Sequence, residues 1–98
     1  MSEPAISPET LLQLAGDVTF QSLGEGMETV ILSLDTGTLY TCNQTTEAFL
    51  RLLGTARSFG EAVDLLLAEY DVGREILESD LREVAQELLA EGLIRRTV

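Results

Sequence analysis

The apolar residues change their spacing near the middle of the chain, and this change constrains the fold more than any other feature of the sequence. Up to Cys42 they form short runs that are separated by turns containing glycine, which is typical of strands. After Asn43 they recur every three or four residues, which is typical of amphipathic helices. The sequence therefore predicts an α+β fold with the order strand–strand–strand–helix–helix–helix.

The strand-rich half contains three predicted strands. They cover residues 18–23, 27–34 and 38–42, with a turn over residues 24–26 between the first two. The preceding segment, residues 7–15, could form a short helix with Ser7 as its cap and Pro8 at its first position, or remain a mobile tail. We therefore expect an N-terminal extension over residues 1–17 and one domain over 18–98.

The turn at residues 35–37 predicts the register of the hairpin. A three-residue loop with Gly37 in the left-handed conformation places Leu32 opposite Tyr40 and Val30 opposite Cys42. These four side chains would then share the face toward the core. A two-residue loop would place Tyr40 beside Ser33 and would group the bulky residues less well.

The helical half contains start and stop signals for three helices. Asn43 or Thr45 can cap the first helix, which Gly54 ends. The segment "SFGE" over residues 58–61 is a capping box that opens a second helix through residue 70. The third helix is expected from about residue 74 to 91, followed by Gly92, with residues 93 and 94 returning to the core.

Size and charge limit the class of partner. Ninety-eight residues, of which 45% are apolar, are enough for one folded domain with a modest core. The chain has seventeen acidic residues against six arginines and no lysine, a formal net charge of -11. Such a surface repels phosphates, so we expect no nucleic acid as a ligand and favour a neutral or basic peptide or protein.

The sequence also contains no signal for export or for membrane insertion. The N-terminus lacks the basic and apolar regions of a signal peptide, and the apolar runs are too short to span a bilayer. A single cysteine excludes an internal disulfide, which is compatible with a reducing compartment. We therefore expect a cytoplasmic protein with no membrane partner.

No pattern in the sequence predicts catalysis. Histidine, the commonest general base and metal ligand, is absent, and Cys42 has no base near it in the sequence and is expected to be a buried core thiol. The acidic residues Glu78 and Asp80 lack the oxygen-rich loop of a calcium site, and neither glycine-containing turn has a phosphate-binding spacing. We expect no enzyme activity, no catalytic residue, no metal site and no cofactor.

The third predicted strand has an unusual edge. Between Gly37 and Asn43 the chain contains no charged residue and no proline. Exposed sheet edges usually carry such residues, because free N–H and C=O groups invite another chain to pair. The strand is therefore either covered by its own protein or available to a partner.

The segments "LDTGTLYTCNQTTEAFLRLL" and "SFGEAVDLLLAEYDVGREILESDLREVAQELLAEGLI" resemble the PqqD-like family of small RiPP precursor peptide recognition elements. These domains serve the enzymes that modify ribosomally synthesised peptides. The matching features are Gly37, Tyr40 and Asn43, then "AEYDV", "ESDL" and "EGLI", and the resemblance covers residues 18–96. Cys42 stands where the family often has leucine, a small departure because both residues are apolar.

The resemblance implies a winged helix-turn-helix-like domain that captures the leader segment of a precursor peptide as an added strand. The leader would lie between the third strand and the third helix. On this basis the expected peptide-binding residues are Thr38, Leu39, Tyr40, Thr41 and Cys42 on the strand, and Leu77, Asp80, Leu81 and Val84 on the helix.

Each of these residues also has a purely structural interpretation. Tyr40 and Cys42 are expected to serve mainly in the core, whereas Leu39 and Thr41 point to the outer face. The three apolar helix residues are core residues that could also wall a pocket with Tyr40 for an aromatic or proline side chain of the leader. Asp80 belongs to a solvated face and could pair with a basic leader residue.

The resemblance implies two pathways. In lasso-peptide synthesis such a domain delivers the precursor to a transglutaminase-like leader peptidase, and a cyclase then closes the ring. In pyrroloquinoline quinone synthesis it presents the precursor to a radical enzyme. The N-terminal segment and the second predicted helix favour the lasso pathway.

Two other classes of function stay open. A winged-helix transcription regulator would share this topology, but the third helix carries more acidic than basic residues, which disfavours DNA. A structural module could instead use the open strand edge to pair with a second copy of itself.

Overall fold

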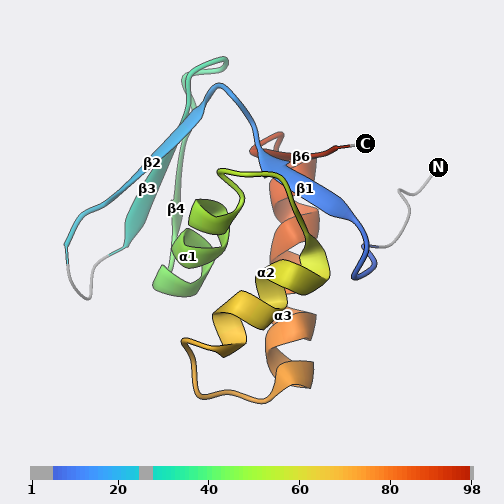
Figure 1. Cartoon of the computed structure of the whole chain (residues 1–98). Helices are drawn as coiled ribbons and strands as arrows, with labels where there is room; N and C mark the ends of the chain where they lie inside the picture. The colour runs from blue at the N-terminus through green and yellow to red at the C-terminus, as the bar shows by residue number, and fades with distance from the viewer. Residues whose placement is uncertain (1–5, 25–27, 98) are drawn as a thin grey trace.

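The structure, a computed structural model, describes residues 6–24 and 28–97, and within them it has an α+β fold (Figure 1). The strands are β1 (Leu11–Leu14), β2 (Val18–Ser22), β3 (Thr29–Ser33), β4 (Leu39–Cys42), β5 (Arg57–Ser58) and β6 (Ile94–Arg96). The helices are α1 (Gln44–Leu52), α2 (Phe59–Leu67) and α3 (Arg74–Ala90). The predicted fold class and the three predicted helices are confirmed.

The described strands form two antiparallel sheets. The first has the order β2-β3-β4 and contains the three strands that the sequence predicts. The second has the order β5-β1-β6 and was not predicted. It joins three segments that are far apart in the sequence, so no local sequence pattern predicts it. Most of the turn expected over residues 24–26 lies outside the described residues.

The helix suggested for residues 7–15 is not formed. The second half of this segment is β1, which pairs with β6 through Leu12↔Arg96 and with β5 through Leu12↔Arg57. Leu12 is fully buried while Leu11 remains 40% exposed, the alternation of a strand. Ile6, further upstream, is also buried in the core. The boundary at residue 17/18 stays a prediction, although β1 lies on its N-terminal side.

The predicted register of the β3–β4 hairpin is wrong by one residue. Tyr40 lies opposite Ile31, and Cys42 lies opposite Thr29. The loop contains one residue more than expected, because the Gly37 N–H donates to the Ser33 carbonyl (2.7 Å) and closes a five-residue turn. Gly37 does adopt the expected left-handed conformation, with φ 73°.

Contacts with the helices explain the observed register. Ile31 is 1% exposed, and the buried Thr29 hydroxyl donates to the Glu47 carboxylate on α1. A shift of one residue would turn both side chains to the outer face. Val30 and Leu32, which were expected in the core, face outward instead.

The helix caps form as the sequence predicts. The Asn43 side chain accepts a hydrogen bond from the Thr46 N–H at the start of α1, and Ser58 does the same for the Glu61 N–H at the start of α2. Helix α2 ends at Leu67, earlier than the expected residue 70. Gly92, with φ 75°, follows α3 and allows the chain to turn back into β6.

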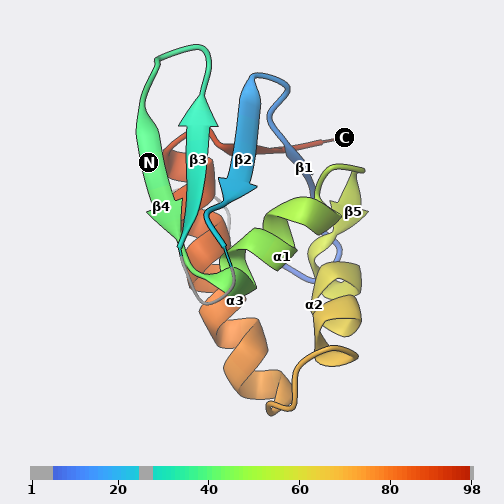
Figure 2. The same ribbon diagram turned by 90° about the vertical axis from the view of Figure 1, so that its left-hand side faces the viewer.

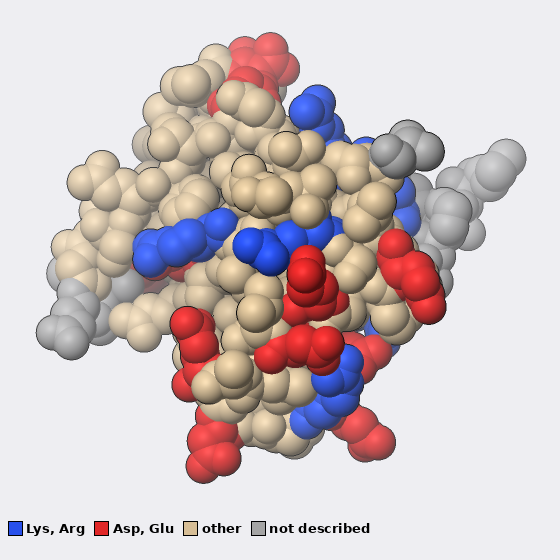
Figure 3. Space-filling model, in the orientation of Figure 1, with Lys and Arg blue, Asp and Glu red and all other residues tan. Residues whose placement is uncertain are grey.

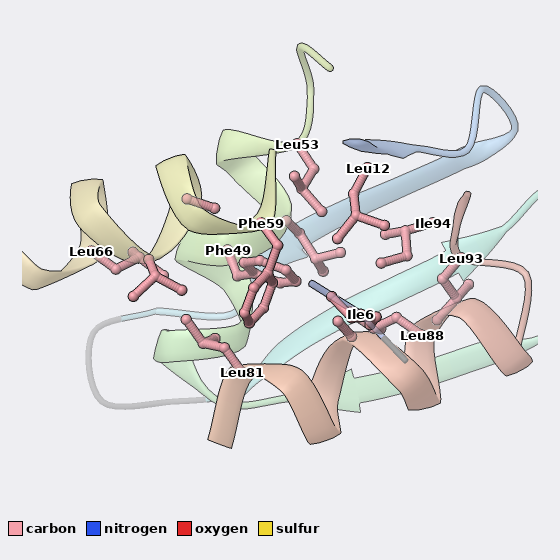
Figure 4. Close-up of a cluster of buried hydrophobic side chains, with 14 of the residues drawn as sticks. Ile6, Leu12, Phe49, Leu53, Phe59, Leu66, Leu81, Leu88, Leu93 and Ile94 are labelled. Carbon is pink, nitrogen blue, oxygen red and sulfur yellow. The ribbon is translucent and has the colours of Figure 1, made fainter. Parts of the chain in front are cut away.

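The core lies between the helices and both sheets (Figure 4). Phe49 of α1 and Phe59 of α2 meet edge to face, with ring centroids 6.4 Å apart. Leu93 and Ile94 return to this core, as predicted. Among the described helices, none combines the length and apolar character that crossing a bilayer requires.

Candidate peptide-binding cleft

Strand β4 forms one edge of the first sheet, and α3 runs beside it. Figure 2 shows β4 at the outer edge with α3 behind it, and no described strand pairs with β4 on its outer side. The order of contacts along the two elements fixes their relative direction. Tyr40 contacts Glu91 near the end of α3, whereas Asn43, after β4, lies beside residues near the middle of the helix. Strand β4 and α3 are therefore antiparallel.

The hydrogen-bond pattern of the ladder shows which β4 groups face the open edge. The Ser33 N–H donates to the Thr38 carbonyl (3.0 Å), so the main-chain groups of Thr38 point toward β3. Along an antiparallel ladder, residues that are hydrogen-bonded to the neighbouring strand alternate with residues that are not. The main-chain groups of Tyr40 and Cys42 consequently point to β3. Those of Leu39 and Thr41 point away from the sheet, where an added strand would need them.

The side chains of β4 alternate in the expected way. Leu39 and Thr41 are exposed, and Leu39 lines a hollow of about 440 Å³ on the outer face of the sheet together with Val30 and Leu32. Tyr40 and Cys42 are half-buried and pack against the core. The predicted assignment of these four side chains to the two faces is confirmed.

Two adjoining pockets lie between β4, the start of α1 and α3. The Tyr40 pocket, of about 280 Å³, is lined by Ile31, Tyr40, Thr41, Cys42, Glu87, Leu88, Glu91 and Leu93. The Leu81 pocket, of about 180 Å³, is lined by Thr45, Tyr70, Val72, Ile76, Leu77, Asp80 and Leu81. Asn43, Thr46 and Val84 line both. Together the two pockets form one cleft along α3.

The predicted site residues divide between these pockets. The four helix residues all line the Leu81 pocket, and Tyr40, Thr41 and Cys42 line the Tyr40 pocket. Tyr40 therefore lines a different pocket from Leu77 and Leu81, and the two pockets share Asn43, Thr46 and Val84. Thr38 and Leu39 line neither pocket.

Several lining residues were missed by the sequence reasoning. Ile76 and Val72 are 65% and 47% exposed, whereas the predicted Leu77 is only 4% exposed and belongs to the core. Their apolar character beside the "DVG" break was the available signal. Glu87 and Glu91 were also missed, although their spacing of four residues places them on one helix face near Val84.

Two ionisable groups of the Tyr40 pocket have shifted pKa values. The Tyr40 hydroxyl donates to Glu91 Oε2 (3.0 Å), and this hydrogen bond raises the pKa of Tyr40. Desolvation, with the nearby carboxylates of Glu47 and Glu28, raises the pKa of the Cys42 thiol to about 11. Cys42 is therefore a neutral thiol near pH 7, in keeping with a structural role.

The charges around the cleft are of one sign. Carboxylates, with arginine side chains among them, gather over the end of the molecule where α2 meets α3 (Figure 3). Asp80, Glu87 and Glu91 line the cleft, and no arginine of the described chain lines either pocket. Four of the arginines form ion pairs elsewhere: Arg51, Arg57, Arg74 and Arg82.

An unpaired strand edge beside apolar pockets is the arrangement of domains that bind an extended peptide by strand addition. Comparison with known families agrees with this class. Residues 28–94 match the family described as coenzyme PQQ synthesis protein D (PqqD), and the chain belongs to this family. No curated protein sequence matches the chain.

Solved structures share the fold. TbiB1, solved in complex with the TbiA(beta) leader peptide, is 29% identical, with a TM-score of 0.71 over 84% of this chain and 93% of that one. A lasso peptide synthetase B1, complexed with its leader peptide, is 22% identical, with a TM-score of 0.68 over 85% and 95% of the two chains. The PqqD truncation of Methylobacterium extorquens PqqCD, a stand-alone RiPP recognition element, is 18% identical, with a TM-score of 0.78 over 94% and 96%.

Proposed function

We propose that this protein binds the leader segment of a ribosomal precursor peptide as an added strand along β4. The observation that carries the proposal is the free edge of β4, with the main-chain groups of Leu39 and Thr41 directed outward, beside a two-pocket cleft. Membership of the PqqD family supports it, as does the likeness to TbiB1, which was solved with a leader peptide.

The dimensions of the cleft suit a short extended segment. The α3 residues that line it run from Ile76 to Glu91, a helical length of about 22 Å at about 1.5 Å per residue. An extended peptide covers this length with about seven residues at about 3.3 Å each. Alternate side chains would face α3, so the two pockets can each take one or two anchors.

The two pockets differ in the side chains that suit them. Tyr70, Ile76 and Leu77 make the Leu81 pocket largely apolar, which suits an aromatic or proline side chain of the leader. Asp80 at its rim is exposed and is available to a basic leader residue. Such a rim-exposed pair contributes about 0–1 kcal/mol.

We further propose that the protein acts without catalysis of its own, as a separate subunit that brings the precursor to its modifying enzymes. The partners proposed are a transglutaminase-like leader peptidase and a cyclase of a lasso-peptide pathway. The alternative is presentation of a precursor in pyrroloquinoline quinone synthesis, which the family's description favours.

Titration of a fluorescently labelled leader peptide from a candidate precursor of the same genome tests the proposal. We expect saturable binding with a Kd between about nanomolar and micromolar. Light scattering of the free and peptide-bound protein separates leader capture from pairing of β4 between two copies. A protein that dimerises through β4 and ignores the peptide would overturn the proposal.

A further inference from the structure

Two carboxylates of α3 line the proposed cleft, and no arginine of the described residues lines it with them. Glu87 and Glu91 line the Tyr40 pocket, and both are exposed. Neither forms an ion pair among the described residues, whereas Glu78, on the same helix, lies within 3.6 Å of Arg74 and 3.0 Å of Arg82. On the side of α3 toward the open strand edge, these two carboxylates therefore have no cationic partner among the described residues, although one Glu91 oxygen accepts a hydrogen bond from the Tyr40 hydroxyl.

We propose that Glu87 and Glu91 make the Tyr40 pocket selective for a cationic side chain, arginine or lysine, of the peptide strand bound beside β4. This inference rests on the proposed strand addition and adds a chemical class to one position of the ligand. It assigns opposite preferences to the two halves of the cleft. The Leu81 pocket takes an apolar side chain, and the Tyr40 pocket takes a cationic one.

The shape and lining of the Tyr40 pocket suit a long basic side chain. Leu88, Leu93 and Ile31 give its floor an apolar character against which the methylene stem of arginine or lysine can pack. The carboxylates stand at the rim, where the charged head would remain partly hydrated. The Tyr40 hydroxyl holds one oxygen of Glu91 at 3.0 Å and leaves the other oxygen free to accept from the ligand.

The number of positions between the apolar and the cationic residue of the ligand follows from the distance between the two pockets along α3. Glu87 lies six residues after Leu81, a rise of about 9 Å at about 1.5 Å per residue. Side chains on one face of an extended peptide repeat about every 6.6 Å. We therefore expect the cationic and the apolar residue of the ligand to be two or four positions apart.

A positional-scanning library of synthetic decapeptides tests the inference. Each pool fixes one position as arginine, lysine, glutamine or glutamate and leaves the others mixed. The binding of each pool is measured to the wild-type protein and to two variants. The first variant is Glu87→Gln with Glu91→Gln. The second, Glu75→Gln with Glu83→Gln, changes the same helix by the same charge outside both pockets.

We expect one position at which arginine or lysine binds better than glutamine, by about two- to tenfold for two partly exposed pairs at low salt. This preference should disappear in the first variant, persist in the second and weaken in 0.5 M salt, where screening shortens to about 4–5 Å. Peptide binding without a cationic preference, or with a preference that both variants retain equally, overturns this inference but leaves strand addition standing. No binding by any pool refutes strand addition itself, and the selectivity with it.

Discussion

Replacement of Thr41 by proline tests the strand-addition geometry directly. The ladder places the Thr41 N–H on the open side of β4, so proline removes a donor that no strand of the described chain uses. Proline is tolerated at sheet edges for this reason. Its fixed φ of about −65° lies within the range that extended backbone adopts.

The expected loss of binding free energy can be calculated from the hydrogen bond that is removed. A main-chain hydrogen bond contributes about 0.5–1.5 kcal/mol net, and a ligand carbonyl left without a partner in the cleft adds about 1 kcal/mol or more. The sum, about 1.5–2.5 kcal/mol, corresponds to roughly 10- to 70-fold weaker binding of a leader peptide. Leu39→Pro should have a similar effect, because its N–H faces the same way.

Two matched proline variants provide the controls. In Cys42→Pro the missing N–H is one that pairs with β3 opposite Thr29, so this variant should lose stability. Each 1 kcal/mol lowers Tm by about 4–8 °C in a domain of this size. Ser22→Pro changes the opposite edge of the sheet, on β2, and should leave both binding and Tm close to wild type.

Fluorescence anisotropy with the labelled leader peptide, together with thermal melts followed by circular dichroism, supplies both readouts. The reasoning predicts a fall in affinity for Thr41→Pro at nearly unchanged Tm. If Thr41→Pro and Leu39→Pro melt like the wild type and bind the peptide with unchanged Kd, the peptide does not pair with β4.

The remaining predictions concern side chains that line the cleft, including Asn43, which also caps helix α1. Ile76→Asp changes a side chain that is 65% exposed and should weaken leader binding several-fold with little change in Tm. Leu77→Asp should unfold the domain, because it buries a charge. Equal effects of the two substitutions on Tm would contradict this difference in burial. Asn43→Ala removes the bond to the Thr46 N–H and should lower the free energy of unfolding by about 0.5–2 kcal/mol, measured by urea titration; an unchanged midpoint would argue against the cap. Burial raises the pKa of Cys42 to about 11, so the rate of alkylation of Cys42 by iodoacetamide should keep rising about tenfold per pH unit through pH 10. A rate that reaches a plateau near pH 9 would contradict the raised pKa.

The features that were predicted correctly are those that neighbouring residues decide. A cap joins residues three apart, so Asn43 with Thr46 and Ser58 with Glu61 can be recognised in a short stretch of sequence. Helical spacing places apolar residues such as Phe49 and Leu81 on a buried face in the same local way. The absence of charge and proline along β4 left two alternatives, an edge that the protein itself covers or an open one, and no described strand covers it.

Tertiary contacts decided the rest. Strands β1, β5 and β6 pair only because the helices bring residues 12, 57 and 96 together, and no local pattern contains that information. The hairpin register depended on the burial of Ile31 and Thr29 against the helices, which outweighed the turn pattern on which the register prediction rested.

The cleft shows the same division. The sequence by itself determined which strand and which helix face one another, through the resemblance to a known family, and it supplied the acidic, histidine-free surface. Only the tertiary structure decided that Tyr40 lines one pocket and Leu77 and Leu81 the other, and that Glu87 and Glu91 line the pocket of Tyr40. The physical reason is that a pocket is the space left between packed elements, so its lining depends on how those elements are rotated and placed against one another.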